Sequence, residues 1–482
     1  MWVAGQAVLS RVIVLVQQLA LAWLLAKSDF GLIGLAYTVT TIVALMANPG
    51  IDAVLVQRMR HFKLWATPAL WLGLAMGLVG LAAMLGLAPV AAWAYGEPRL
   101  IGLIAVLAVA LPFQALQIVP KSLLRTQMRF GAVVMLGLLN SVVTALLTIG
   151  MAWFGLGAYS LVVPVPIAAA VTALATWIMA RPTIRRRVEF TRWKYLFGNS
   201  LVVGVTEVLH VFINQADYMA LGLAGLSDET IGAYVFAYSI AIQPLRVISG
   251  NIPIVLFPGL SHLSGTPEKQ ALAALRAMRL SMLVTVPVCL LQVQLAEPLF
   301  RLFFPPKWLD AVLPCQLLTI GLMVNAACWP ANSLLLAQGR FRDRMWLAVA
   351  GTAAFVVLLA ATILKFPSIV SVAVVVMVFH VAYSPLFHWW TVRGLVPRGS
   401  FVRELGPPLA AGLAAFVPGL VLMQYLPPTR WGDVTAIAAV SVLFAVIYLA
   451  MLFLLAPKSV HDFWQQVAPL WQRIWPKRAR AG

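Results

Sequence analysis

Charged residues are scarce in this chain. Of its 482 residues only 10% are Asp, Glu, Lys or Arg, whereas 62% are hydrophobic. The polar stretches between the apolar runs are too short to form a soluble domain of any size, and the runs themselves are long enough to cross a bilayer. This composition predicts a membrane protein with many spans.

Other absences exclude classes of function. The three cysteines, Cys289, Cys315 and Cys328, lie in apolar stretches without the spacing of a metal site or a disulfide framework. No G-x-x-x-x-G-K-[ST], G-x-S-x-G or H-E-x-x-H sequence occurs. We therefore expect no catalytic residues, no metal and no cofactor, and the protein is predicted not to be an enzyme.

Positive charge is in excess, with a net charge of +19. In a soluble protein such a charge would suggest nucleic-acid binding. In a membrane protein it indicates cytoplasmic loops and contact with anionic membrane lipids, so no nucleic-acid partner is expected.

The apolar runs predict fourteen membrane-spanning helices. Their expected ranges are 3–25, 30–48, 66–94, 100–119, 131–152, 159–180, 198–222, 231–258, 280–300, 311–336, 345–364, 368–390, 406–425 and 434–456. Most of the 34 Lys and Arg residues fall in every second gap between these spans. Because positively charged loops stay in the cytoplasm, this alternation predicts that both termini are cytoplasmic. The remaining gaps hold only Lys27, Arg99, Arg301, Lys307, Lys365 and Arg430.

A weak internal repeat relates the two halves of the chain. Residues 30–37 (FGLIGLAY) align with residues 231–238 (IGAYVFAY), and each segment belongs to the second span of a six-span set. Parallel six-span repeats are typical of transporters. The repeat predicts an N-terminal lobe at 1–180, a cytoplasmic linker at 181–197, a C-terminal lobe at 198–393, two extra spans at 394–457 and a basic interfacial tail at 458–482.

The sequence Thr266-Pro267-Glu268 has the composition of a helix N-terminus. It predicts that a helix starts here, continues through Arg276 and Arg279, and lies on the inner membrane surface.

Ionisable residues within spans indicate function because their insertion costs a few kcal/mol each. Arg11 and Arg246 are candidates to bind an anionic headgroup, since a guanidinium matches phosphate oxygens in a bidentate manner. In the seventh span a polar stripe at i, i+3, i+7 and i+10 would face other helices or a wet cavity and can tune the site or carry protons. The stripe consists of Glu207, His210, Asn214 and Asp217.

A structural alternative stays open for these residues. Glu207 or Asp217 can pair with Arg11 or Arg246 and hold the lobes in register. Asp217 lies near the outer end of its span, where a structural or gating role is favoured.

The chain resembles the polysaccharide transporter family of the multidrug/oligosaccharidyl-lipid/polysaccharide flippase superfamily. The residues that carry the resemblance occur in the family's order over most of residues 1–400. They are Leu24–Gly31, Pro49–Ile51, Val56–Arg58, Arg125 with Phe130, Asn214 and Asp217, Gly232, Tyr234, Ala237, Tyr238, Leu256–Pro258, Phe304 and Lys307-Trp308. The chain begins almost directly at its first span, where family members usually have a short cytoplasmic lead.

The resemblance implies an all-α fold of two six-helix lobes in a V-shaped arrangement, plus two C-terminal helices, working by alternating access around a cationic cavity. It implies a flippase that moves undecaprenyl-diphosphate-linked oligosaccharides across the bacterial inner membrane for exopolysaccharide or O-antigen assembly. Partners would be this lipid, membrane lipids, and a polysaccharide polymerase with its export machinery. The alternatives are a cation-coupled drug or metabolite exporter and a membrane-embedded glycan polymerase or ligase. The last needs a large periplasmic loop, which the predicted threading lacks.

Overall fold

The computed structural model describes residues 2–47, 51–52, 55, 62–184, 193–248, 256, 260, 263, 265–327 and 329–457. In these ranges every regular element is a helix, and no residue forms a β-strand. Among the described residues, eleven helices or runs of joined helices are long and apolar enough to cross a membrane. The protein is therefore an all-α, multi-pass membrane protein, as its composition predicts.

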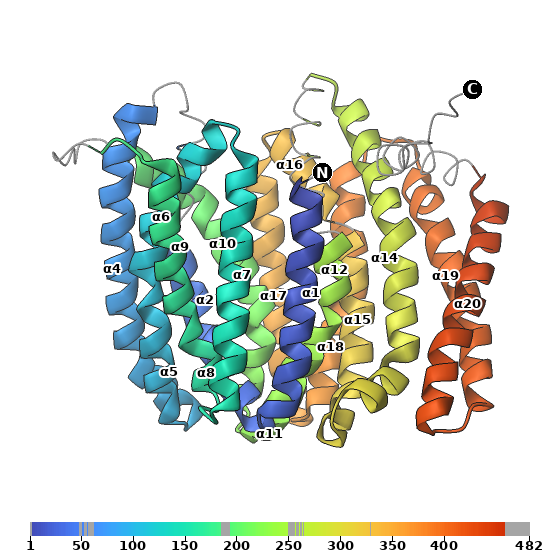
Figure 1. Ribbon diagram of the computed structural model, residues 1–482. Coiled ribbons are helices and arrows are strands. Elements are labelled where there is room, and N and C mark those ends of the chain that lie inside the picture. The colour runs from blue at the N-terminus through green and yellow to red at the C-terminus, as the bar shows by residue number, and fades with distance from the viewer. Residues whose placement is uncertain are drawn as a thin grey trace, which may run out of the picture. The chain divides into compact units, whose positions relative to one another are not determined.

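Each of the fourteen predicted spans contains a helix (Figure 1). The helices of the first half are α1 (Trp2–Leu24), α2 (Lys27–Ala47), α4 (Phe62–Tyr95), α5 (Arg99–Ala108), α6 (Ala110–Thr126), α7 (Phe130–Trp153), α8 (Tyr159–Val162) and α9 (Pro164–Ala180). Those of the second half are α10 (Trp193–Leu223), α11 (Asp228–Ala241), α12 (Gln243–Ile248), α14 (Pro267–Phe303), η3 (Pro306–Ala311), α15 (Val312–Ala327), α16 (Pro330–Ala337), α17 (Phe341–Lys365), α18 (Ile369–Val392), α19 (Ser400–Gln424) and α20 (Arg430–Leu455).

The helix predicted to start at Pro267 is present and is longer than expected. This helix, α14, continues without interruption for 37 residues to Phe303. Nothing between Glu268 and Pro287 breaks the backbone hydrogen-bond ladder, so the amphipathic start and the apolar span form one helix. Arg279 consequently lies in the body of α14, where it is buried.

The described helices form two compact units. Unit 1 comprises Met1–Ala237 and Met345–Val375, and unit 2 comprises Tyr238–Arg344 and Val376–Gly482. The boundaries of these units differ from those of the repeat. The helix α10 belongs to the second half of the chain but packs on α2 and α4 of the first half. The lobe boundaries expected from the repeat stay a prediction. Most of the linker and the whole basic tail lie outside the described residues.

Unit 1 contains a close contact between the two copies of the repeated segment. A Cβ atom added at Gly31 of α2 would overlap the carbonyl oxygen of Asp228 in α11. A Cβ atom at Gly232 of α11 would overlap the carbonyl oxygen of Lys27 in α2. Lys27 and Asp228 each lie four residues before the glycine of their own helix, so the contact is reciprocal. This arrangement supports the repeat and explains why both copies keep glycine here.

The connections of unit 1 sort to two ends of its helices. At one end Arg125 forms an ion pair with Asp52, and Arg129 donates to the carbonyl oxygen of Met179. At the other end Arg99 pairs with Asp228. The predicted cytoplasmic gaps thus meet one another at one end, and predicted outer gaps meet at the opposite end.

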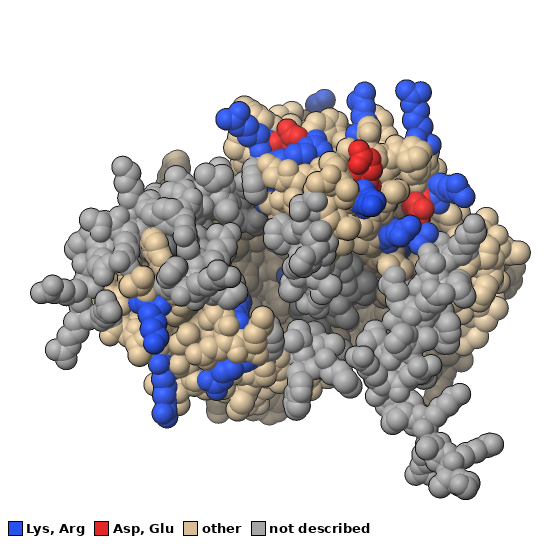
Figure 2. All heavy atoms as spheres, turned by 90° about the horizontal axis from the view of Figure 1, so that it is seen from above, with Lys and Arg blue, Asp and Glu red and all other residues tan. Residues whose placement is uncertain are grey.

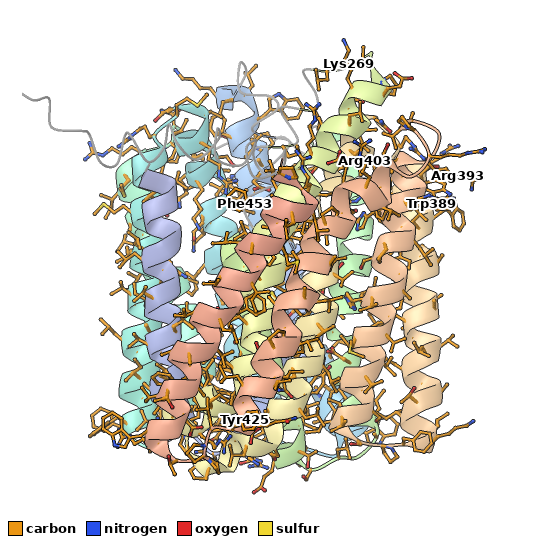
Figure 3. All side chains as sticks on the ribbon, turned by 90° about the vertical axis from the view of Figure 1, so that its right-hand side faces the viewer. Lys269, Trp389, Arg393, Arg403, Tyr425 and Phe453 are labelled. Atoms are coloured by element: carbon orange, nitrogen blue, oxygen red, sulfur yellow. The ribbon has the colours of Figure 1, made fainter. Side chains whose placement is uncertain are left out.

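Unit 2 shows the same segregation. In Figure 3, Lys269, Arg393 and Arg403 lie at one end of the helices, and Tyr425 lies at the other. Figure 2 looks down on the basic end, where Lys and Arg side chains gather. The labelled basic residues of unit 2, all from predicted cytoplasmic gaps, thus lie at one end of its helices.

The two C-terminal helices α19 and α20 pack on α14 and on each other. The Tyr448 hydroxyl donates to the Leu283 carbonyl oxygen at 2.9 Å, and Gln294 Nε2 donates to the Phe416 carbonyl oxygen at 2.9 Å. Arg279 of α14 also pairs with Glu404 of α19 at 2.8 Å. Polar side chains that would be costly in lipid therefore hold these helices together.

Candidate functional site

Arg246, a predicted substrate-binding residue, lies on α12. This short helix follows a break in the predicted eighth span, because α11 ends at Ala241 and Pro244 has no N–H to donate to the preceding turn. The guanidinium is exposed and forms no hydrogen bond or ion pair with a residue in the described ranges. An accessible cation within an apolar span requires water or an anion as its partner.

Asp217 is buried near the end of α10 in unit 1. Its carboxylate accepts hydrogen bonds from the Tyr234 hydroxyl at 2.8 Å and from the Tyr218 backbone N–H at 2.9 Å. The ring of Tyr234 also packs edge-on against Tyr218. Asp217 therefore joins α10 to α11 through Tyr234, and among the residues whose side chains the structure describes no arginine pairs with it.

The other predicted site residues are placed only by their helices. Arg11 lies on α1, and Glu207 and His210 lie on α10, but their side chains are outside the part that the structure describes. Asn214 is half-buried on the same helix. Because α10 is continuous from Trp193 to Leu223, the spacing predicted for the polar stripe is retained on one helix.

Unit 1 also contains a polar pocket that the sequence did not single out. Its volume is about 550 Å³. It lies between α6, α7 and α9, which pack against one another in the arrangement that Figure 1 shows. Its wall includes Gln114, Gln117, Lys121 and Arg125 of α6, and Asn140 of α7.

Two cations lie at one end of this pocket. Arg125 pairs with Asp52 at 3.1 Å. Lys121 lies one turn further into α6, is half-buried, and forms no hydrogen bond or ion pair with a residue in the described ranges. The charged groups known to line the pocket therefore leave one positive charge uncompensated.

Amide side chains occupy the deeper part. Gln117 Nε2 donates to the Ala169 carbonyl oxygen at 2.8 Å, and Asn140 Oδ1 accepts from the Thr172 hydroxyl at 3.3 Å. Gln114 and Asn140 are both exposed, although they lie within apolar helices. These groups can offer hydrogen bonds to a polar occupant of the pocket.

The sequence contains a pattern that indicates the pocket, but the predicted end of the fourth span separates its residues. Gln114, Gln117, Lys121 and Arg125 recur at i, i+3, i+7 and i+11, which places them on one face of a helix. The predicted span ended at residue 119, so Lys121 and Arg125 were assigned to a cytoplasmic loop. The structure extends α6 to Thr126 and makes the stripe continuous.

A second cluster of ionisable groups lies at the opposite end of unit 1. Arg99 bonds to Glu97 at 2.6 Å and to Asp228 at 3.0 Å. The hydrogen bond from Arg99 lowers the pKa of the Glu97 carboxyl below its usual range. Burial raises the pKa of Asp228, and the nearby negative charge of Glu97 adds to this rise. The cluster joins the connection before α5 to the start of α11.

Solved structures of membrane transport proteins share this fold. It matches the lipid II flippase MurJ in an inward closed conformation, with a TM-score of 0.75 and 13% identity over 95% of this chain and 100% of that chain. A multidrug resistance MATE family transporter in an inward-facing conformation matches with a TM-score of 0.59 and 15% identity, over 80% of this chain and 95% of that one. At these identities the likeness shows the fold alone.

The sequence comparisons are more specific. A family model described as polysaccharide biosynthesis protein matches residues 20–313, which is more than half of the chain. The chain therefore belongs to this family, in agreement with the resemblance noted above.

Two curated relatives match about two thirds of the chain. The succinoglycan biosynthesis transport protein ExoT of Rhizobium meliloti (strain 1021) is 24% identical over 68% of this chain and 66% of its own length. The lipopolysaccharide biosynthesis protein WzxC of Escherichia coli (strain K12) is 22% identical over 70% of this chain and 69% of its own length.

Proposed function

We propose that this protein is a flippase that moves undecaprenyl-diphosphate-linked oligosaccharide repeat units from the cytoplasmic to the periplasmic leaflet. The product would enter exopolysaccharide or O-antigen assembly. The observation that carries the proposal is the match of residues 20–313 to the polysaccharide biosynthesis protein family. The fold shared with a lipid II flippase supports it. On this proposal the protein is a transporter and not an enzyme.

The physical task explains the architecture. Sugars and a diphosphate would lose their hydration in hydrocarbon, so they need a polar route through the protein. Arg246, which is exposed within an apolar segment, can bind phosphate oxygens through two parallel hydrogen bonds. Arg11 on α1 is the second proposed ligand, and the polyprenyl chain would stay in lipid. Alternating access of two lobes would then expose the headgroup to the other side.

The proposal includes an orientation and partners. The basic ends of the helices would face the cytoplasm of a bacterial inner membrane, with both termini inside. Anionic lipids of that leaflet would contact the same basic ends. A polysaccharide polymerase and the export machinery would receive the translocated units.

A cation-coupled exporter is the alternative, because MATE transporters share the fold. Such a protein needs an acidic site for its cation. In the described residues of unit 1, however, Asp217 is bonded to Tyr234, and the polar pocket carries more cationic than acidic groups. Among the described residues, neither feature supplies the acidic cation site that such an exporter needs.

A complementation assay tests the proposal. The chromosomal gene for this protein is deleted, variants are expressed from a plasmid, and exported polysaccharide is measured. We expect Arg246→Ala to reduce export at least tenfold with unchanged protein level, and Arg246→Lys to restore only part of it, because an ammonium lacks the planar fork. The matched control is Arg398→Ala, which removes an exposed arginine from the connection before α19. Normal export by Arg246→Ala, or normal polysaccharide in a deletion strain, contradicts the proposal.

A further inference from the structure

We propose that the polar pocket of unit 1 is a binding site for a phosphate-bearing headgroup. It is defined as the cavity lined by Gln114, Gln117 and Lys121 of α6, Asn140 of α7, and the Arg125–Asp52 pair. This inference goes beyond the proposed function, since such a site can exist whether or not the protein moves a glycan.

The charge of the pocket selects an anion. Asp52 is the acid in the described lining, and its carboxylate is already paired with Arg125. The Lys121 ammonium is half-buried and has no partner in the described ranges, so no described residue compensates for its lost hydration. A bound cation would meet net repulsion here, whereas an anion would restore the missing interaction.

The neutral groups select phosphate rather than a small halide. The Asn140 oxygen is occupied by Thr172, which leaves its amide N–H groups available to donate. Gln114 is accessible and makes no hydrogen bond with a described residue. Together with Lys121, these side chains offer several donors to an oxyanion with several acceptor atoms.

The size of the pocket also fits a headgroup. A volume of about 550 Å³ exceeds what a bare ion needs and lies in the range of sites for small organic ligands. The wall beside the donors is apolar, with Ile118, Leu136 and Val165. A phosphate ester attached to a lipid or a sugar could therefore place its charged group near Lys121 and its organic part against this wall.

Binding to the purified full-length protein in phosphatidylcholine nanodiscs tests the site. The probe is farnesyl diphosphate, and farnesol is the uncharged control. We expect saturable binding of the diphosphate and none of farnesol, with Lys121→Gln weakening the affinity at least tenfold. Lys269→Gln is the matched control, because Lys269 is an exposed lysine in unit 2 outside the pocket lining. It should leave the affinity unchanged.

A second variant keeps the test decisive if Lys121→Gln does not fold. Gln114→Leu removes a donor whose side chain makes no hydrogen bond with a described residue, so the fold should tolerate it, and the affinity should fall about three- to tenfold. The proposal is overturned if every variant that folds binds farnesyl diphosphate as tightly as the wild type does. It is also overturned if farnesol binds as well as the diphosphate.

Competition distinguishes the source of the phosphate. If phosphatidylglycerol in the nanodisc displaces the probe, the site binds a membrane-lipid headgroup. Displacement by inorganic phosphate indicates a free anion, and displacement by neither indicates a prenyl diphosphate cargo. Binding that depends on Lys121 in a protein that exports nothing would sustain this inference and refute the flippase, whereas export without such binding would do the reverse.

Discussion

Gly31 and Gly232 lie at equivalent positions of the internal repeat, and each accommodates a backbone oxygen of the helix that carries the other. The contact brings the two copies of the repeated segment together within unit 1. The Phe30 and Phe236 rings pack edge-to-face beside it, with centroids 5.6 Å apart.

Substitution of either glycine by alanine should weaken the contact between α2 and α11. The added methyl group meets a carbonyl oxygen rather than a flexible side chain, so the helices must shift, at a cost of about 1–3 kcal/mol. We expect Gly31→Ala and Gly232→Ala each to lower the thermal unfolding midpoint by several degrees. Gly86→Ala is the control, because it adds the same methyl group in α4 with nothing within 4 Å. An equal midpoint in all three variants would argue against a close contact.

The carboxyl of Glu97 should make stability depend on acid pH. Its pKa is lowered by the hydrogen bond from Arg99, so the folded state binds a proton less readily than the unfolded chain. The stabilisation is therefore present above the usual pKa of 4.5 and lost as the pH falls through the lowered value. Because the pair is partly exposed, its contribution should not exceed about 1 kcal/mol.

The measurement is the unfolding midpoint of wild type and Glu97→Gln between pH 7 and pH 3. Glutamine keeps a hydrogen-bond acceptor but does not titrate. The wild type should lose more stability than the variant over this interval. Parallel pH profiles would mean that Arg99 does not stabilise the ionised carboxylate.

The ion pair between Arg279 and Glu404 should couple α14 to α19. Arg279 retains only 11% side-chain exposure and Glu404 29%, and the two atoms are 2.8 Å apart. Removing either partner leaves a poorly solvated charge, so each single alanine variant should be destabilised more than expected from lost contacts. A double-mutant cycle on unfolding free energies should give a coupling of about 1–2 kcal/mol. A coupling near zero would show that the pair is screened by solvent.

Cysteine labelling should reveal the orientation of the helices. Cys289 and Cys315 are buried and should not react with a maleimide in intact membranes. In a Cys328→Ser background, Arg430→Cys should react with an impermeant maleimide from the periplasm. Arg398→Cys should react only after the membrane is permeabilised, because it lies at the basic end that the positive-inside rule assigns to the cytoplasm. The reverse pattern would invert the proposed topology.

Much of the architecture could be predicted from the sequence, because each span must satisfy its own backbone in lipid and must be apolar over a bilayer thickness. The fourteen expected spans each contain a helix, and residues of the predicted cytoplasmic gaps lie together, as in the Arg125–Asp52 pair of unit 1. Helix ends were harder to place. Residues such as Lys121 can extend a helix beyond its apolar part, since a long side chain can reach a polar region.

The pairing of side chains depended on the tertiary structure. Asp217 and Arg99 stood out in the sequence as a charge in a span and a charge in an outer gap, but their partners Tyr234 and Asp228 come from another helix. Hydropathy and charge act along the chain, so the sequence by itself determined that this is a polytopic helical membrane protein and where its basic loops fall. Contacts between helices depend on packing in three dimensions, and only the tertiary structure decided that two repeated glycines meet and that Lys121 lines a pocket.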